Sequence, residues 1–383
     1  MTHENHHHAM TDGGSGAGYD GRAAADRMIE RVRRTADEVG ERFPLYADPA
    51  TGVWTTTRRG SWTGGFWAGL LRLTAARTGD PADRARATAT TRRLRERAAD
   101  DTDTRGMTFW YGAARGTLPG EPAEAAETAE TVREGAAALA AARRPDGSGG
   151  EYIPLGSALG HGERGTTTLG VDAAAAVISL LARAGRTHGE PGWEKLAEAH
   201  ATAVLTHCVT PDGTVLATAR PGDPAPAGPA HPGWPRGHAW GMAALTTAAR
   251  SLRSPAPVFL EAARRTTDVW LERTGGTVPP WSFDDPTGPR DTSAGAIAAE
   301  TMLRLADTLD GPDAVRYRRA AHRLIARLVE DHLGRPGPAE GAPPAGALRD
   351  GCYDMATGTA VAHELIWGDY FLLAALLRPA PTG

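Results

Sequence analysis

Lysine is almost missing from this chain of 383 residues: Lys195 is the single lysine among 42 basic residues, and the others are arginine. With 46 acidic residues the formal net charge is −4, and no basic stripe stands out, so we expect no nucleic-acid partner. The accompanying richness in alanine, arginine and glycine indicates a genome of high GC content and carries no functional signal.

Cysteine is equally scarce, with Cys208 and Cys352 only. Two isolated cysteines exclude a disulfide scaffold and suit a reducing compartment, so we expect a cytoplasmic protein. No apolar run reaches the roughly 18 residues of a membrane span, so no membrane partner is expected. Neither cysteine has a CxxC or zinc-finger spacing, so we expect no metal site at them.

The first 21 residues, MTHENHHHAMTDGGSGAGYDG, contain no hydrophobic segment, so we expect no secretion signal there. His6, His7 and His8 would also fit metal binding or the remnant of a tag. The surrounding glycine and serine favour a disordered tail over both. We therefore expect a tail at 1–21 and a single domain at 22–380.

Helix-start signals recur along the rest of the chain. A proline or an acid in a Gly/Asp/Pro turn precedes an Ala/Arg-rich amphipathic segment, as in RTGDPADRARATATTRRL from residue 77 and DGPDAVRYRRAAHRLIARL from residue 310. Convincing strands are rare, VLATAR at 215–220 being the best candidate. Periodicity predicts about twelve helices, near 22–40, 61–78, 81–99, 103–115, 121–143, 170–185, 193–207, 235–252, 256–274, 292–309, 313–333 and 366–378.

The helix starts lie roughly 40 to 70 residues apart, which is the length of a helical hairpin with a variable loop. About twelve helices in pairs predict an all-α fold, a closed ring of six αα-hairpins. An open superhelical array is the alternative, but such arrays have more uniform spacing between repeats.

Tryptophan outnumbers phenylalanine in this chain, with ten residues against six. Core packing would explain each tryptophan taken singly. Their recurrence in loops before alternate helices, beside aspartate, arginine and glycine, favours a pocket that holds a sugar ring against flat aromatic faces. The tryptophans in question are Trp54, Trp62, Trp110, Trp234, Trp240, Trp281 and Trp367.

Four segments together resemble one enzyme family. They are SWTGGFWAGLLRLTAARTGD (61–80), GWPRGHAWGMAAL (233–245), VPPWSFDDPTGPRDTSAGAIAAETMLRL (278–305) and LIWGDYFLLAALLR (365–378). They resemble, in order and over most of the chain, the motifs of unsaturated glucuronyl hydrolases, glycoside hydrolase family 88. The resemblance implies an (α/α)6 barrel, in agreement with the hairpin count, so the domain at 22–380 is expected to be catalytic.

The resemblance also implies a reaction. Family members remove a terminal 4,5-unsaturated uronic acid from saccharides that a polysaccharide lyase has produced. A carboxylic acid protonates C4 of the vinyl ether, water adds at C5, and the resulting hemiketal opens and releases the aglycone. This chemistry needs a carboxyl group that is protonated at working pH and still basic enough to activate water. It implies a saccharide or uronate substrate and no cofactor.

Asp172, in TTLGVDAAAAVISLL, lies where the family has its acid/base aspartate. Without the resemblance, an acid at this place would more often be a charge favoured by a helix N-terminus. Arg236, in WPRGHAW, matches a family arginine and is a candidate for substrate binding through its guanidinium group. A structural arginine that binds loop carbonyls is an equal alternative. His238 replaces a family glutamine, and we expect it to face the barrel mouth although an isolated histidine is more often structural.

Aromatic residues complete the expected substrate site. Trp62 matches the family's W-x-x-G-F-W pattern and is expected to stack on the sugar, with Trp234, Trp240 and Trp281 as further substrate contacts. Asp291 in RDTSAGA is expected to be a helix cap with no direct part in the chemistry.

The stretch DTDTRGM at 101–107 departs from the family pattern D-T-H-D-x-G-F. In ungapped register the family's second aspartate falls on Thr104 and its histidine on Asp103. We predict that Asp103, displaced by one residue, is the partner of Asp172, that Thr104 lines the substrate site, and that Arg105 adds a cation for an acidic substrate group. A family histidine after a D-G-S turn is also missing, Ala217 being near that point.

These departures keep two alternatives open. One is an enzyme on the same barrel with altered chemistry, such as a lyase, a hydratase or a cyclising enzyme of specialised metabolism. The other is a sugar-binding barrel without catalysis. This alternative is the weaker one, because a binding barrel does not need an acid among its tryptophans.

Overall fold

The computed structural model describes residues 19–116, 122–222, 233–253, 256–336 and 344–379. The expected tail therefore lies almost wholly outside the described residues, and helix α1 begins at Gly21. Outer helices are α1 (Gly21–Val39), α3 (Pro81–Arg93), α5 (Pro122–Ala141), α8 (Pro191–Cys208), α10 (Ala256–Thr274) and α12 (Gly311–Arg327). Inner helices are α2 (Gly64–Thr78), α4 (Arg105–Phe109) with the π-helical η2 (Trp110–Ala114), α7 (Ala174–His188), α9 (Pro235–Ser251), α11 (Thr292–Ala306) and α13 (Ile366–Leu376).

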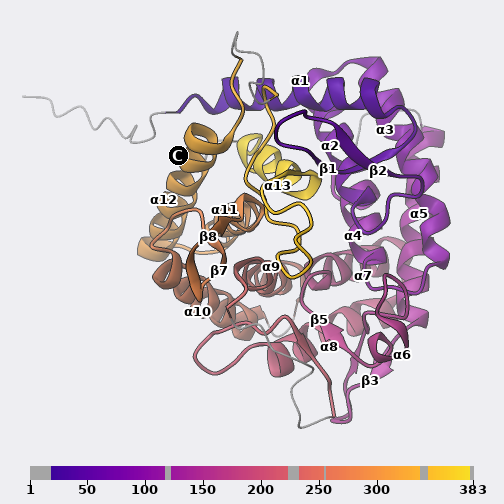
Figure 1. The fold of residues 1–383 in the computed structure, drawn as a ribbon. Helices are drawn as coiled ribbons and strands as arrows, with labels where there is room; N and C mark the ends of the chain where they lie inside the picture. Colours follow the sequence, from indigo (N-terminus) through magenta and orange to yellow (C-terminus); the bar gives the residue numbers. More distant parts are fainter. Residues whose placement is uncertain (1–18, 117–121, 223–232, 254–255, 337–343, 380–383) are drawn as a thin grey trace, which may run out of the picture.

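The inner helices form a closed ring. Helix α2 packs on α4 and η2, these on α7, α7 on α9, α9 on α11, α11 on α13, and α13 returns to α2. Each inner helix also packs on an outer helix, and Figure 1 shows α9, α11 and α13 enclosed by α1, α10 and α12. The ring closes, which excludes the open array and confirms the expected (α/α)6 barrel.

Local signals fix the helix ends. The Asp80 carboxylate accepts a hydrogen bond from the Ala82 backbone N–H (2.8 Å) at the start of α3, and Pro81 occupies the first turn. Asp291 caps α11 in the same way, with its Oδ1 atom 3.1 Å from the Ser293 backbone nitrogen. The expected capping role of Asp291 is thus confirmed.

Two glycines of the SWTGGFWAG motif let α2 approach its neighbours closely. A Cβ atom at Gly65 would lie 2.4 Å from the backbone oxygen of Met107 in α4, and one at Gly69 would lie 2.5 Å from the ring of Tyr370 in α13. A methyl group does not fit at either distance, so these positions require glycine.

Three predicted helices are only partly α-helical. The segment 81–99 finishes as the 3-10 helix η1 (Leu94–Ala99), 103–115 divides into α4 and η2, and 313–333 finishes as the π-helix η3 (Leu328–His332). The four-residue helix α6 (Gly162–Gly165) was not predicted. A 3-10 or π-helical turn of five or six residues hardly changes the 3.6-residue spacing of apolar side chains. Sequence patterns therefore do not distinguish such a turn from an α-helical one.

The strands are short and serve as loop hairpins. Strands β1 (Phe43–Ala47), β2 (Trp54–Thr57) and β9 (Glu364–Leu365) form one antiparallel sheet in the order β2-β1-β9. The strand expected at 215–220 reduces to β6 (Thr218–Ala219), which pairs with β5 (Leu169–Gly170). Two further hairpins are β3 (Arg144–Pro145) with β4 (Glu151–Tyr152), and β7 (Pro280–Ser282) with β8 (Asp285–Arg290). No helix among the described residues is long and apolar enough to cross a membrane.

Candidate active site

The inner helices begin at one end of the barrel. Each inner helix follows an antiparallel outer helix, so consecutive inner helices run in the same direction and their N-termini gather at one mouth. The residues of the resembling motifs precede or open these helices: Trp62 before α2, Asp103 before α4, Asp172 before α7, Trp234 before α9, Asp291 before α11 and Leu365 before α13. The fold thereby collects side chains that are far apart in sequence.

Asp103 and Asp172 lie near each other at this mouth. The backbone N–H of Asp103 donates to the Leu155 carbonyl (3.1 Å), and a Cβ atom at Gly170 would lie 3.8 Å from the Asp103 Oδ2 atom. Gly170 is in β5, two residues before Asp172. The negative charge of Asp172 acts on Asp103, which shows that the two carboxyl groups are within electrostatic range.

Both carboxyl groups have raised pKa values. Asp103 is 3% exposed, and burial together with the charge of Asp172 raises its pKa well above the ordinary value. Asp172 is partly exposed, and loss of solvation raises its pKa to about 6, against a smaller lowering effect of Arg236. Two neighbouring carboxyl groups with raised pKa values form an arrangement suited to acid/base chemistry.

The structure does not support a capping role for Asp172. The N-cap of α7 is Ala173, and no side chain caps this helix. No hydrogen bond from the described residues reaches the Asp172 carboxyl group, which is held in place by the pairing of β5 with β6 and by the Val171 N–H bonded to the Ala217 carbonyl (3.1 Å). The carboxyl group is therefore free to contact a substrate.

Arg236 is a structural arginine at the same mouth. Its Nη1 atom lies 2.8 Å from Asp291 Oδ2 and also donates to the Cys352 carbonyl, while Nη2 donates to the Tyr353 carbonyl (2.7 Å). The guanidinium carbon of Arg236 lies 5.1 Å from the centroid of the Trp234 ring and 5.6 Å from that of the Trp367 ring. These bonds hold the loop that carries Tyr353, which favours the structural alternative, and substrate binding by Arg236 stays a prediction.

Trp62 belongs to an aromatic wall with Tyr353 and Trp367. Its Nε1–H donates to the Tyr353 hydroxyl (3.1 Å), the two rings are nearly parallel at 18°, and the Trp62 and Trp367 ring centroids are 4.6 Å apart. Trp62 and Tyr353 remain partly exposed, so their faces are available to a ligand. Tyr353 was missed by sequence reasoning, although its aromatic ring in the loop GCYDMATG was an available signal.

Trp234 and Trp281 are also partly exposed, and both lie at the mouth. The Phe283 N–H donates to the Gly233 carbonyl (2.7 Å), which fastens the β7–β8 hairpin beside Trp234. Trp281 Nε1 donates to Asp285 Oδ2 (2.9 Å) within that hairpin. Thr104 is partly exposed, with its hydroxyl 3.1 Å from that of Thr102.

Three expected substrate contacts point elsewhere. His238 does not face the mouth: it is fully buried and its Nε2 atom lies 2.8 Å from the Thr266 carbonyl of α10. Trp240 is 1% exposed and packs against Phe371, so it belongs to the core. Arg105 is 7% exposed, and its Nε and Nη1 atoms donate to the carbonyls of Thr102 and Ala98.

Among the residues that the structure describes, no group of three His, Cys, Asp or Glu side chains gathers as a metal site.

No protein-family profile matches the chain. It is 31% identical to the unsaturated glucuronyl hydrolase of Bacillus sp. (strain GL1), over 90% of this chain and 93% of that protein. It is 29% identical to the unsaturated chondroitin disaccharide hydrolase of Streptococcus pyogenes serotype M1, over 93% of this chain and 90% of that one. The crystal structure of the Bacillus sp. GL1 enzyme, described as responsible for degradation of glycosaminoglycan, superposes with a TM-score of 0.80 at 28% identity, covering 94% and 96% of the two chains. This similarity over nearly the whole chain shows that the protein is a hydrolase of the unsaturated glucuronyl hydrolase family, glycoside hydrolase family 88.

Proposed function

We propose that this protein removes a terminal 4,5-unsaturated uronic acid from a saccharide, by hydration of the vinyl ether, with Asp172 as general acid and base. The observation that carries the proposal is the placement of Asp103 and Asp172, whose pKa values are raised, at the same mouth as the partly exposed rings of Trp62 and Tyr353. A single catalytic domain at 22–380 belongs to the same proposal.

The reaction needs two proton transfers at one carboxyl group. Protonated Asp172 gives its proton to C4, and positive charge develops at C5, next to the ring oxygen. Water adds to C5 and returns a proton to the Asp172 carboxylate, so the net change is the addition of one water molecule. The hemiketal at C5 then opens, and the aglycone leaves. A pKa of about 6 lets the same carboxyl group act first as acid and then as base near neutral pH.

Asp103 is assigned as the partner of Asp172. Burial and the negative charge of Asp172 raise the pKa of Asp103 well above the ordinary range. A carboxyl group with a raised pKa can exchange a proton with Asp172 or with the attacking water, which an amide at this place cannot do. Thr104, the next residue, has no carboxyl group. Because its side chain is partly exposed, we assign it to substrate contact.

The sugar ring is assigned to the wall of Trp62 and Tyr353, with Trp234 and Trp281 on the neighbouring loops. Aromatic faces pack against the C–H surface of a sugar while their polar edges remain bonded to protein. The names of the relatives favour saccharides that derive from glycosaminoglycans as substrates. A cytoplasmic location is part of the proposal, because Cys208 and Cys352 are both free and buried.

The test is a panel of lyase-produced disaccharides from chondroitin, hyaluronan, heparin and plant or algal uronides. The conjugated C4=C5 bond absorbs ultraviolet light, so hydration is expected to abolish that absorbance for at least one substrate. If every member of the panel remains unchanged under the wild-type protein, the proposed reaction is wrong. Ligand binding without turnover would instead favour a sugar-binding role.

A further inference from the structure

A cavity of about 160 Å³ lies at the end of the barrel opposite the mouth. Residues near the C-termini of α2 and α7 line it, together with η2 and one face of α5. Helix α7 has 15 residues, so its two ends are roughly 20 Å apart, and the cavity is separate from Asp172 by about that length. The lining residues are Arg72, Thr88, Ala113, Ala114, Gly116, Glu124, Ala125, Thr128, Ala129, Val132, Arg183, Thr187 and His188.

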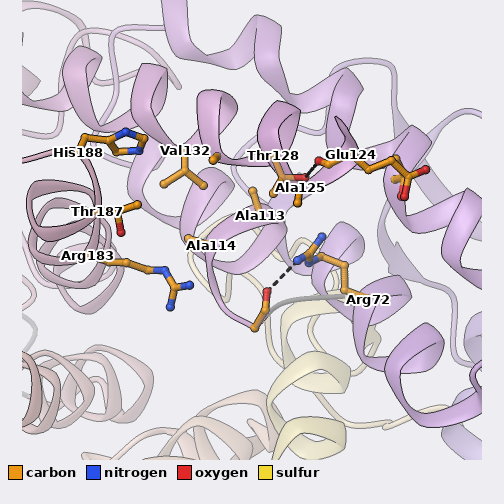
Figure 2. Close-up of a pocket in the computed structure, with 13 residues that line it drawn as sticks. Arg72, Ala113, Ala114, Glu124, Ala125, Thr128, Val132, Arg183, Thr187 and His188 are labelled. Carbon is orange, nitrogen blue, oxygen red and sulfur yellow. Dashed lines mark hydrogen bonds between the residues drawn. The ribbon is translucent and has the colours of Figure 1, made fainter. Parts of the chain in front are cut away.

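Arg72 is the unusual member of this lining. It is 7% exposed, and its guanidinium group makes one hydrogen bond, from Nη2 to the Gly116 carbonyl (2.8 Å), which Figure 2 shows. Its Nε atom is buried and has no hydrogen-bond partner in the described part of the chain. A buried cation normally has an anionic partner, because transfer from water to protein is costly without one.

No carboxylate of the described residues supplies that partner. Glu124 lines the same cavity, but no ion pair joins it to Arg72, and Tyr370 is the one group whose charge acts on Arg72. Burial accordingly lowers the Arg72 pKa. Three other buried arginines of the described residues show the contrast: Arg31 is paired with Glu364, Arg97 with Asp100 and Arg236 with Asp291.

Two more cationic or donor groups face the cavity from α7. Figure 2 shows Arg183 and His188 on the side opposite Arg72, with Thr187 between them. The Nε2 atom of His188 is buried without a hydrogen-bond partner in the described residues. Three nitrogen-bearing side chains thus surround one space, and two of them have buried nitrogen atoms without a hydrogen-bond partner among the described residues.

We propose that this cavity is a binding site for a small oxyanion, phosphate or sulfate, held by Arg72, Arg183 and His188. Guanidinium groups bind the oxygens of such anions through paired N–H donors. An anion would neutralise Arg72 and accept hydrogen bonds from the unsatisfied nitrogens. A water molecule needs some 10–15 Å³ of such space, so 160 Å³ also holds a few waters or part of a sugar attached to the anion.

The experiment is calorimetric titration of the full chain with inorganic phosphate, and separately with sulfate, at constant ionic strength set by chloride. Saturable binding of one anion per chain is expected. Arg72→Met should weaken binding by roughly tenfold or more, because it removes the buried donor group. Arg34→Met, which removes an exposed arginine of α1, is the matched control and should change affinity less than about twofold.

Arg183→Met provides a second measurement if Arg72→Met does not fold. Arg183 is exposed, so its replacement should leave the fold intact and weaken binding by roughly threefold or more. A parallel titration with a hexose phosphate distinguishes a free anion from a phosphorylated sugar, since tighter binding of the latter identifies the sugar as part of the ligand. Absence of saturable binding by all three probes at millimolar concentration, or equal affinity of the Arg183→Met and Arg34→Met variants, would overturn the proposal.

Discussion

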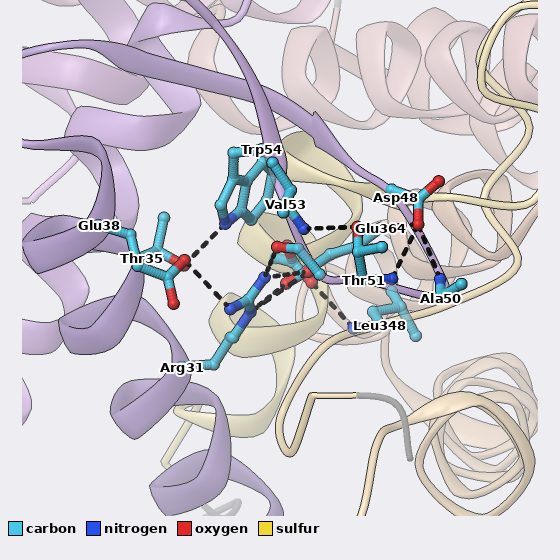
Figure 3. Close-up of polar contacts among 12 residues, drawn as sticks. Arg31, Thr35, Glu38, Asp48, Ala50, Thr51, Val53, Trp54, Leu348 and Glu364 are labelled. Atoms are coloured by element: carbon cyan, nitrogen blue, oxygen red, sulfur yellow. Dashed lines mark hydrogen bonds and ion pairs between the residues drawn. The ribbon is translucent and has the colours of Figure 1, made fainter. Parts of the chain in front are cut away.

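Arg31 and Glu364 form a buried ion pair between the first helix and the last strand of the barrel. The Arg31 Nη2 atom lies 2.8 Å from Glu364 Oε2, and each side chain is 4% exposed. Figure 3 shows the guanidinium group of Arg31 also below the indole of Trp54 and beside Glu38. Because 333 residues separate the two partners in sequence, this pair joins the ends of the chain and helps to close the ring.

Arg31→Met is expected to lower the free energy of unfolding by about 3–5 kcal/mol. The substitution leaves the Glu364 carboxylate buried without its cation, which costs more than the pair itself contributed. Urea denaturation followed by circular dichroism measures the change. The matched control is Arg86→Met, which breaks the pair of Arg86 with Asp37 on the outer surface of α1, with side chains 43% and 66% exposed. It should cost less than about 1 kcal/mol, and equal losses in the two variants would contradict the role assigned to Arg31.

Helix positions were predictable from sequence because their causes are local. Asp80 and Pro81 start α3 through a cap and a fixed backbone angle, and Asp291 starts α11 through its own carboxylate. The closure of the ring was predictable only from hairpin spacing and family resemblance. The Arg31–Glu364 pair was not predictable, since no local pattern relates residues at opposite ends of a chain.

The orientation of individual site residues was harder to predict. Helix α9 is buried on nearly all sides, so the 3.6-residue period does not distinguish its mouth-facing residues from the others. His238 and Trp240 therefore looked like pocket residues beside Trp234, although one packs toward α10 and the other into the core. Arg105 was misread because loop carbonyls, which have no sequence signature, accept its hydrogen bonds.

Asp103→Asn is expected to lower kcat/KM by roughly ten- to a hundredfold, because it removes the titratable partner of Asp172. Thr104→Val is the matched control at the next position and should change kcat/KM by only a few fold, since Thr104 has no carboxyl group to lose. Steady-state kinetics on a lyase-produced disaccharide measure both variants. A larger loss in Thr104→Val than in Asp103→Asn would show that the assignment is displaced by one residue.

Asp172→Asn is expected to lower kcat/KM by about 10²–10⁴-fold, as for other general acids and bases. Asparagine keeps the shape of the side chain but can neither donate the proton to C4 nor take one from water. Retention of full turnover would remove Asp172 from the mechanism. Circular dichroism of the variant serves as the check that the fold is unchanged.

The pH dependence of kcat/KM should report the pKa of Asp172. The acid must be protonated to act, so the rate is expected to fall as pH rises above about 6, by about tenfold per pH unit. An ordinary aspartate would lose its proton at much lower pH, so the raised pKa extends activity toward neutral pH. Asp103→Asn should leave the position of this limb unchanged, because burial and the charge of Arg236 set the pKa of Asp172. A profile that stays level across this range would contradict the assignment.

Arg236→Met should move that limb to higher pH. The positive charge of Arg236 favours the ionised form of Asp172 and lowers its pKa, so its removal is expected to raise the pKa above about 6. The same substitution leaves Asp291 unpaired with its side chain 2% exposed, so the free energy of unfolding should also fall by about 3–5 kcal/mol. Arg236→Lys separates the two effects, because it retains the charge near Asp172 and loses the paired bonds to the Cys352 and Tyr353 carbonyls. If Arg236 acted only as a structural support, the two variants would share one pH profile, whereas an electrostatic action requires a shift in Arg236→Met alone.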